Sequence, residues 1–436
     1  MRLGALERLT PPWAQVRVLE REGEIREGGK VVLAVKRGPT ELKWVVRHTD
    51  FEEGRLFKDE QVSGPFGKWV HAHRFLPSED GGCVVEDHVE WLPPLGSAGR
   101  LFAEGYIHRE LERLFSFRHA RLRHDLDLHA RYGKGDPLTV AITGASGLIG
   151  SALRHFLETG GHTVIPISRR QSAGGASWNP EKGDIDADAL QGIHGVVHLA
   201  GEPIFGLRWT EEKKARIMDS RQKGTELLSR TLGGLARKPA VLVSASGAGF
   251  YGNRGPTVIT EEAESGKGFL ARVCRKWEEA TAPAKRAGIR VVTLRTGMVL
   301  TPRGGALGTM LLPFKMGVGG RLGSGRQYVS WIDLDDEVGL IYHALATNTL
   351  KGPMNATAPH PVPNSTFTDT LGRVLGRPTL IPVPAMGVKA LFGEMGQALL
   401  LDGARVVPQK AEKTGFEFRY PSLEESLRFQ LGRAER

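Results

Sequence analysis

The chain has 436 residues, 40% of them hydrophobic and 25% charged, and a formal net charge of +10 at pH 7. This length exceeds what one hydrophobic core usually organises, so we expect at least two globular domains. The sequence has no apolar run long enough to span a membrane, no long apolar core of a signal peptide near Met1, and only two distant cysteines, which excludes a disulfide framework. The basic residues are dispersed without a recognition motif, so we expect a cytoplasmic protein with neither membrane nor nucleic-acid partners.

The first third of the chain alternates apolar and polar residues with a period of two, and a helical pattern follows at about residues 98–129. The predicted strands are residues 31–35, 41–47, 55–61, 68–75 and 82–90. An antiparallel sheet followed by one long helix is therefore expected, an α+β domain at residues 1–132. Glycines and a proline in residues 133–137 then form a linker.

Residues 9–13 and the run DEQVSGPF at 59–66 resemble the START-like, polyketide-cyclase-like superfamily. The resemblance implies a helix-grip domain that encloses an apolar ligand between sheet and helix. Few residues precede Pro11, so we expect the first strand of that superfamily to be missing, either because the true start codon lies upstream or because the sheet is shorter. His71 and His73 alternate on one strand face, but without a third ligand in register we expect no metal there.

The run TGASGLIG at residues 143–150 follows an apolar stretch and precedes a helical pattern at 151–158. Gly144 permits a tight turn, Gly147 lets backbone amides approach a pyrophosphate, and Gly150 lets a helix pack close to its strand. A second strand at 163–167 follows at βαβ spacing, so we predict a dinucleotide site rather than a structural turn. The expected contacts are Gly144, Ala145, Ser146, Gly147, Leu148 and Ile149.

The end of that second strand bears on the choice of cofactor. Sites that prefer NAD usually hold the ribose 2′-hydroxyl with an acidic side chain at this position. This chain has Ser168, Arg169 and Arg170 there, and no carboxylate before Glu181. Guanidinium groups fit a phosphate and serine can donate a further hydrogen bond, so these residues predict NADP(H). The alternative is two solvated surface arginines.

Further short apolar strands at residues 195–199, 241–246 and 290–294 alternate with helical stretches. This alternation predicts an α/β fold with a Rossmann, doubly wound parallel sheet in a domain at residues 138–436. Residues 301–436 form its C-terminal α/β extension, which we expect on the substrate side, over the carboxyl ends of the strands.

Residues 138–430 resemble the extended short-chain dehydrogenase/reductase superfamily, and within it the epimerase-like oxidoreductases with a C-terminal domain of unknown function. The motifs are HLAGEP at 198–203, RWT at 208–210, SAS at 244–246, FYGNRG at 250–255, LRTG at 294–297, SWIDLDD at 330–336, GPMNATAP at 352–359 and GFEFRYP at 415–421. The resemblance implies that Leu199, Ala200 and Gly201, at the end of the fourth strand, also bind the cofactor.

Hydride transfer in that superfamily resembles acid–base catalysis by a tyrosine, a lysine four residues on, a serine and an asparagine. The serine place matches Ser246, but the asparagine place holds Arg221, and the tyrosine and lysine places hold Leu270 and Cys274. Leucine exchanges no proton and a thiol carries no positive charge, so the usual pair is absent. We expect Tyr251 as a substitute whose pKa Arg221 lowers. The alternative is that Tyr251 only packs the loop.

Four further side chains on the expected ligand side are candidates for substrate contacts: Arg208, Trp209, Arg295 and Arg326. The first two form a basic, aromatic segment suited to an anion, although Thr210 capping a solvated helix is the alternative. Arg295 lies at the end of the sixth strand, and Arg326 lies in a glycine-rich loop suited to closing over a ligand. We expect Asp335 and Asp336 to cap a helix rather than to act as paired carboxylates.

Taken together, the sequence predicts an NADP(H)-dependent oxidoreductase or epimerase-like enzyme for an unidentified small molecule, fused to a domain that binds an apolar ligand. The competing hypothesis is a non-catalytic NADP(H) sensor, which the missing tyrosine and lysine favour. The retained Ser246 favours an enzyme.

Overall fold

The computed structural model describes residues 4–23, 25–38, 40–79, 81–94, 96–133, 135–170, 174–206 and 208–433. The chain divides into two compact units, the first formed by Leu9–Ala120 and the second by Arg2–Arg8 together with Arg121–Arg436. The division falls inside the long helix α2 (Gly96–Tyr132).

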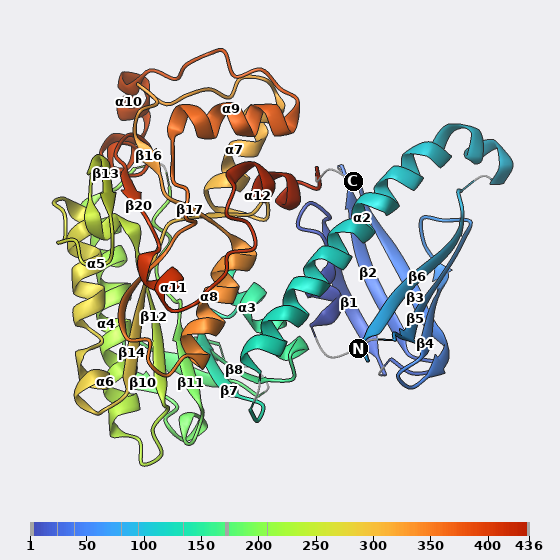
Figure 1. Ribbon diagram of the computed structural model, residues 1–436, viewed down its shortest axis with the longest axis horizontal. Coiled ribbons are helices and arrows are strands. Elements are labelled where there is room, and N and C mark those ends of the chain that lie inside the picture. Colours follow the sequence, from blue (N-terminus) through green and yellow to red (C-terminus); the bar gives the residue numbers. More distant parts are fainter. Residues whose placement is uncertain are drawn as a thin grey trace. The chain divides into compact units, whose positions relative to one another are not determined.

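The first unit contains one antiparallel sheet. In the described residues it has six strands in the order β1-β2-β3-β4-β5-β6, so each strand pairs with its neighbours in sequence. The strands are β1 (Val16–Glu22), β2 (Lys30–Arg37), β3 (Thr40–Glu52), β4 (Leu56–Ser63), β5 (Lys68–Pro77) and β6 (Cys83–Leu92). The first part of α2 runs along one face of this sheet, which confirms the helix-grip arrangement (Figure 1).

Strand β1 was not among the predicted strands. Only Val16 and Val18 are partly buried, and the residues from Leu19 to the end of the strand are exposed. The apolar periodicity that identifies a half-buried strand is therefore too short here to be recognised.

The second unit is built on a mainly parallel sheet. Its order, in the part of the chain that the structure describes, is β10-β9-β8-β7-β11-β12-β14-β18, and each neighbouring pair is parallel except β10 with β9. The strands are β7 (Thr139–Thr143), β8 (Thr163–Ser168), β9 (Ala176–Asn179), β10 (Asp184–Ile185), β11 (Gly195–His198), β12 (Val241–Gly247), β14 (Arg290–Thr296) and β18 (Gly352–Ala356). The chain changes direction across the sheet between β7 and β11, the kind of position at which such sheets bind ligands beyond the carboxyl ends of their strands. The predicted Rossmann fold is confirmed.

Helices cover both faces of this sheet (Figure 1), with α4, α5 and α6 on one face and α3 and α8 on the other. Their bounds are α3 (Leu148–Thr159), α4 (Glu211–Gly234), α5 (Phe269–Glu279), α6 (Ala282–Arg286) and α8 (Leu334–Ala346). Leu153 and Val338 pack on one face, and Leu228 and Ala284 on the other, all fully buried. Burial of these two apolar layers is the main force that stabilises the unit.

Most of the other elements of this unit gather at one end of the sheet, where α7, α9 and α10 lie near one another (Figure 1). They are β13 (Gly255–Ile259), β15 (Met298–Leu300), α7 (Gly305–Lys315), β16 (Tyr328–Val329), β17 (Trp331–Asp333), β19 (Val362–Pro363), α9 (Asn364–Leu375), α10 (Ala385–Gly396), β20 (Ala404–Val406) and α12 (Leu423–Gln430). Helix α11 (Gln409–Lys413) instead packs beside β18, with Ala411 in the apolar core of the sheet. The short strands pair as β13 with β20, β15 with β17 and β16 with β19. Trp331, Phe367 and Leu427 centre a separate apolar core here.

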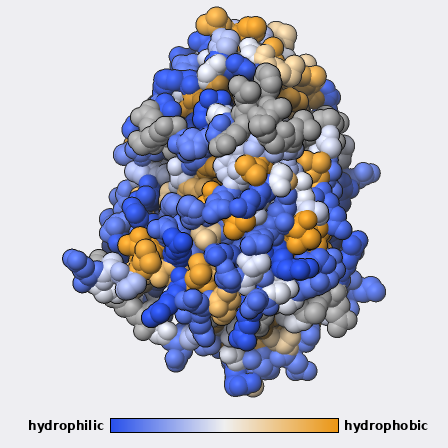
Figure 2. Space-filling view, turned by 90° about the vertical axis from the view of Figure 1, so that its right-hand side faces the viewer, coloured by the Kyte–Doolittle hydropathy of each residue, from blue (hydrophilic) through white to orange (hydrophobic). Residues whose placement is uncertain are grey.

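Apolar side chains on the face that Figure 2 shows lie in small groups among polar ones. Leu380 and Met386, 87% and 81% exposed, are the most exposed large apolar residues and flank the start of α10. Among the helices of the described residues, none combines the length and the apolar character that crossing a bilayer requires.

Candidate functional site

The glycine-rich turn between β7 and α3 has the geometry of a phosphate-binding loop. Gly144 has a φ of +69°, and a Cβ placed on it would lie 3.1 Å from the backbone nitrogen of Ala200. A Cβ on Gly150 would lie 2.1 Å from the carbonyl oxygen of Gly144, so only glycine lets α3 begin this close to the turn. Gly147 is the N-cap of α3, and no side chain caps the first helical turn. The backbone amides of this first turn are thus left to bind an anion.

A buried hydrogen-bond chain ties β7 to β11 beside this turn. The Thr143 hydroxyl oxygen accepts from the amides of Leu199 and Ala200 at 3.1 and 3.2 Å, and it donates to His198 Nδ1 at 2.7 Å. His198 Nε2 then donates to the Thr225 hydroxyl at 2.9 Å. Burial lowers the pKa of His198 to about 3, so the ring is neutral. His198 therefore fixes the backbone at the carboxyl end of β11 and does not act as a base. In the sequence, His198 was recognised only as part of the motif HLAGEP.

The residues predicted to select the cofactor lie at the end of β8, next to β7 in the sheet. The Ser168 hydroxyl donates to the backbone oxygen of Arg170. Arg169 and Arg170 are exposed, and neither guanidinium has a hydrogen bond or an ion pair with the described part of the chain. Two positive charges are thus available beside the glycine turn.

A second network lies at the carboxyl ends of β12, β14 and β18. Ser246, Arg295 and Asn355 are register partners on these three strands. Ser246 donates to Glu278 Oε1 at 2.9 Å, and Arg295 donates to both Glu278 carboxylate oxygens at 2.9 Å. Arg295 Nη1 also donates to the Tyr251 hydroxyl at 2.9 Å, which donates to Asn355 Oδ1 at 2.6 Å.

The structure thus brings together Ser246, Tyr251 and Arg295, three residues that the sequence predicted as separate candidates. They meet around Glu278, which sequence analysis did not propose as a site residue. A signal was present, because Glu278 lies in the last turn of α5, the helix whose tyrosine and lysine places are filled by other residues. Parallel strands align at their carboxyl ends, so polar residues ending three neighbouring strands could have been expected to share a partner.

Tyr251 ends the short 3-10 helix after β12 and is fully buried. Burial raises its pKa, although the neighbouring Arg295 favours the phenolate. The expectation that Arg221 lowers this pKa is wrong, because Arg295 is the cation beside the hydroxyl and the net shift is upward. This geometry favours a packing role, and proton donation by Tyr251 stays a prediction.

Arg221, in the asparagine place on α4, is buried beneath the end of β11. Its Nη1 donates to the backbone oxygens of Glu202 and Ile217 at 2.9 and 3.2 Å, and its guanidinium lies 4.8 Å from the ring centre of Trp277. Burial lowers its pKa to about 10, so it still carries a charge at neutral pH. A Cβ on Gly201 would lie 3.2 Å from this guanidinium, so Arg221 supports the backbone predicted to line the cofactor.

The tyrosine and lysine places stay without acid–base groups in the structure. Burial raises the pKa of the Cys274 thiol to about 11, so it is uncharged at neutral pH. Leu270 packs close to Gly249, with its Cβ 3.2 Å from where a Cβ on that glycine would lie. Neither residue exchanges a proton at neutral pH.

Arg208 is held by protein backbone. Its Nε donates to the carbonyl oxygen of Leu391 at 3.0 Å and its Nη2 to that of Ala390, both in α10. Arg326, by contrast, is exposed, directly after Gly325, whose φ is +69°. Of these two predicted substrate contacts, Arg326 has the freer side chain.

Trp209 is buried, and its indole N–H donates to the backbone oxygen of Ile204 at 2.8 Å. Thr210, the next residue, is the N-cap of α4 and accepts from the amide of Lys213 at 3.1 Å. The capping alternative therefore accounts for this segment, and a substrate contact by Trp209 stays a prediction.

The acidic residues at the start of α8 do not play the role expected of them. Asp333 is the N-cap and accepts from the amide of Asp335 at 2.8 Å. Asp335 forms buried ion pairs with Arg8 at 3.0 Å and Arg121 at 2.8 Å. Asp336 accepts from two backbone amides after α11. Asp335 and Asp336 do lie in the first turn of α8, but the prediction that they cap the helix is wrong, because Asp333 is the N-cap.

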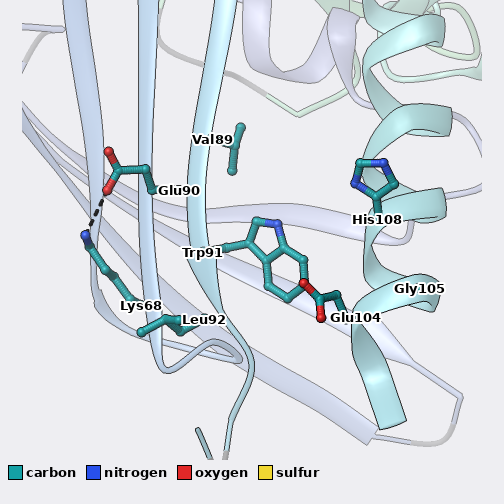
Figure 3. Close-up of a pocket in the computed structure, with 8 residues that line it drawn as sticks. All are labelled: Lys68, Val89, Glu90, Trp91, Leu92, Glu104, Gly105 and His108. Carbon is teal, nitrogen blue, oxygen red and sulfur yellow. Dashed lines mark hydrogen bonds and ion pairs between the residues drawn. The ribbon is translucent and has the colours of Figure 1, made fainter. Parts of the chain in front are cut away.

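The first unit has a pocket of ≈ 700 Å³ between the sheet and α2 (Figure 3). It is lined by Lys68, Val89, Glu90, Trp91, Leu92, Glu104, Gly105 and His108. Trp91 lies toward Glu104 of the helix, while Lys68 and Glu90 form an ion pair at 2.8 Å at the other side of the strand. The lining is thus partly apolar and partly charged.

Three protein families match consecutive parts of the chain. Residues 2–115 match the polyketide cyclase/dehydrase and lipid transport family, residues 140–356 the NAD dependent epimerase/dehydratase family, and residues 383–430 a domain of unknown function. The epimerase family protein Mb2239 of Mycobacterium bovis is 45% identical over 296 residues, which are 67% of this chain and 98% of that protein. The chain belongs to the epimerase family. The predicted family and its fusion to a START-like domain are confirmed.

Other epimerase family members share the same region. Human epimerase family protein SDR39U1 is 35% identical over 297 residues, 67% of this chain and 99% of that protein. Among solved structures, a nucleoside-diphosphate sugar epimerase from Corynebacterium glutamicum is 34% identical with a TM-score of 0.81, covering 99% of this chain and 86% of its own. The structure of human SDR39U1 with NADPH is 33% identical with a TM-score of 0.63, covering 68% of this chain and 99% of its own. The second unit is thus a nucleotide-binding, epimerase-like unit.

Proposed function

We propose that this epimerase-family protein is an NADP(H)-dependent oxidoreductase or epimerase-like enzyme that acts on a small molecule. The observation that carries the choice of cofactor is the pair of exposed, unpaired guanidinium groups of Arg169 and Arg170 beside the glycine turn. The human relative solved with NADPH supports the same choice.

The residues present fit such a cofactor. The uncapped first turn of α3 and the turn that begins at Gly144 suit a pyrophosphate, and Ser168 with the two arginines suits a 2′-phosphate. The position between β7 and β11, where Thr143 and His198 fix the backbone, suits the dinucleotide that runs across it. The bound cofactor would supply hydride transfer.

Ser246 and Glu278 support a proton path at the end of β12. The Ser246 hydroxyl is 2.9 Å from Glu278 Oε1 and donates to it, so its lone pairs remain to accept from a substrate hydroxyl. A proton leaving a substrate alcohol can then pass through Ser246 Oγ to the Glu278 carboxylate. We take this pair, in preference to the buried Tyr251, as the acid–base group.

The first experiment is calorimetric titration with NADPH, NADP, NADH and NAD. We expect tight binding of NADPH and NADP that falls toward the NADH and NAD values in Arg169→Ala. The matched control is Arg286→Ala, an exposed arginine that ends α6 before the amino end of β14, which should bind like the unmodified protein. If none of the four nucleotides binds, the proposed function is wrong.

The second candidate function is an NADP(H) sensor without turnover. The absent tyrosine–lysine pair and the closed hydrogen bonding of Tyr251 favour it. A screen of carbonyl and alcohol substrates that follows NADPH oxidation or NADP reduction separates the two. An enzyme of the proposed kind should lose turnover in Ser246→Ala while still binding nucleotide, and should keep most of it in Tyr251→Phe. Turnover that survives Ser246→Ala and vanishes in Tyr251→Phe would restore the phenol as proton donor.

For the first unit we propose a small ligand with an apolar body and a polar end. The match to a lipid transport family and the lining of Val89, Trp91 and Lys68 support this proposal. Titration with an environment-sensitive fatty-acid fluorophore tests it. Trp91→Ala should weaken binding, whereas Leu380→Ala, which removes an exposed apolar side chain in the second unit, should not.

A further inference from the structure

The interior face of the first unit's sheet carries an unusual concentration of histidine and aspartate. Asp59 and His71 are direct cross-strand partners on β4 and β5, and His73 and Asp87 are partners on β5 and β6. His71 and His73 are 4% and 3% exposed. The sequence-based statement that the two histidines lack a third ligand in register is wrong, because ligand atoms of Asp59, His71 and His73 all lie within 4.8 Å of one another.

Asp87 orients both histidines. Its Oδ1 lies 2.9 Å from His71 Nε2 and 2.7 Å from His73 Nδ1, and its Oδ2 lies 2.8 Å from His119 Nε2. A carboxylate only accepts, so each of these nitrogens donates its N–H to Asp87. This is the arrangement in which a second carboxylate fixes the tautomer and the ring orientation of metal-binding histidines.

The other nitrogen of each ring faces Asp59. His73 Nε2 is 3.2 Å and His71 Nδ1 is 4.0 Å from the same oxygen, Asp59 Oδ2. Zinc bonds of about 2.0–2.2 Å in tetrahedral geometry separate neighbouring ligand atoms by roughly 3.3–3.5 Å. The two separations from Asp59 Oδ2 bracket that range, and all three ligand atoms lie within 4.8 Å of one another, so side-chain rotations can place them around one ion.

The position between His71 and Asp59 is poorly satisfied. With its proton on Nε2, the neutral His71 ring turns the lone pair of Nδ1 toward Asp59 Oδ2. His48 Nδ1 lies 2.6 Å from the other oxygen, Asp59 Oδ1, and pairs with this carboxylate from the opposite side. A cation between His71 Nδ1 and Asp59 Oδ2 would satisfy the lone pairs that face each other there.

The local charge also leaves room for a cation. The carboxylates of Asp59 and Asp87 both attract the positive charge of Arg118, on α2. Neutral histidines therefore leave one net negative charge before a divalent ion binds.

We propose that Asp59, His71 and His73 bind one divalent transition-metal ion, with zinc the ion that this pair of imidazoles and one carboxylate suits. Asp87 is its positioning residue. On the same strand, Val89 and Trp91 continue this face of β6 into the pocket of Figure 3, so an open coordination position would lie next to that pocket. This inference does not depend on nucleotide binding by the second unit.

The test is competitive titration of the full chain with Zn²⁺ against a chromophoric chelator, after removal of metal with a strong chelator. A Cys83→Ser background removes an exposed thiol that could itself bind zinc. We expect one tight site per chain, weakened at least 100-fold by Asp59→Asn and by His71→Gln. The control is His88→Gln, an exposed histidine of β6, which should titrate like the background protein. Unchanged circular dichroism and an unchanged thermal melt show that each variant is folded.

A second readout uses Co²⁺, whose visible absorption reports a nitrogen- and oxygen-ligated site. The background protein should show these bands and Asp59→Asn should lack them. Asp87→Asn should keep a stoichiometry of one but bind roughly 10–100-fold more weakly, as loss of an orienting carboxylate does. If the background protein and Asp59→Asn bind Zn²⁺ equally, or if neither binds, the proposed site does not exist and the cluster is a hydrogen-bond network.

Discussion

Glu337 offers a direct test of the buried electrostatics of the second unit. It is 1% exposed on α8, where its Oε1 accepts from the Thr296 hydroxyl at 3.0 Å. In the described residues its Oε2 has no hydrogen-bond partner. Burial raises the pKa of this carboxyl from 4.5 to about 8, opposed only by the bond from Thr296. The folded protein should therefore carry Glu337 in its neutral form at pH 7.

The sign of the pH effect follows from proton linkage. Between pH 4.5 and 8 the folded state holds a proton on Glu337 that the unfolded state has lost, so stability falls as pH rises through this window. One pKa unit corresponds to about 1.4 kcal/mol, so the cost is about 3 kcal/mol at pH 7 and approaches about 5 kcal/mol above pH 8. Glu337→Gln removes the titration and retains an oxygen that can accept from Thr296.

The assay is the difference in unfolding free energy between Glu337→Gln and the unmodified protein, measured by denaturant titration from pH 4.5 to 9. The variant's advantage should be smallest near pH 4.5 and should grow with pH until it levels above 8. Glu412→Gln, an exposed residue of α11, is the control and should show no such trend. A difference that stays constant across this range would refute the assignment of a neutral, buried carboxyl.

Two further substitutions test the packing of the second unit. Gly150→Ala puts a methyl group 2.1 Å from the Gly144 carbonyl oxygen. It should destabilise the unit by about 1–3 kcal/mol in thermal melts and weaken nucleotide binding in titrations. The control is Gly234→Ala, where nothing lies within 4 Å of the added methyl group, and it should change neither. Asp335→Asn removes a buried carboxylate charge from Arg121 and from Arg8, which keeps its ion pair with Asp125. It should cost about 3–5 kcal/mol in denaturant titration, and a loss below about 1 kcal/mol would contradict the buried pairing. The pKa of Asp335 is lowered from 3.8 to about 2, because its attraction to the two arginines outweighs burial, so its stabilising contribution is present above pH 3.8 and should be lost as pH falls toward 2.

The nucleotide site was predictable because its signals are local in sequence. Gly144, Gly147 and Gly150 lie within one turn and the start of one helix, and their spacing between a strand and a helix is typical of a phosphate-binding loop. The same holds for Arg169 and Arg170, which directly follow a strand. Each of these predictions needed only the order of adjacent elements.

The polar network at the carboxyl ends of β12, β14 and β18 was harder to predict, because its partners are far apart in sequence. Ser246 meets Glu278 and Arg295 only because three strands and α5 converge. The sequence therefore led to the prediction that Arg221 is the cation near Tyr251, whereas Arg295 occupies that place. Long-range pairing of this kind follows from strand register, which motif spacing does not encode.

The sequence by itself determined the α/β and helix-grip fold classes and the family, because periodicity and glycine spacing report local backbone geometry. Only the tertiary structure decided which side chains share a site. Asp59 lies twelve residues before His71 and Asp87 fourteen after His73, yet strand register places the carboxylates on either side of the imidazoles. Whether a buried polar residue is a ligand, a partner or a cap depends on what faces it, and that is fixed by packing between distant segments.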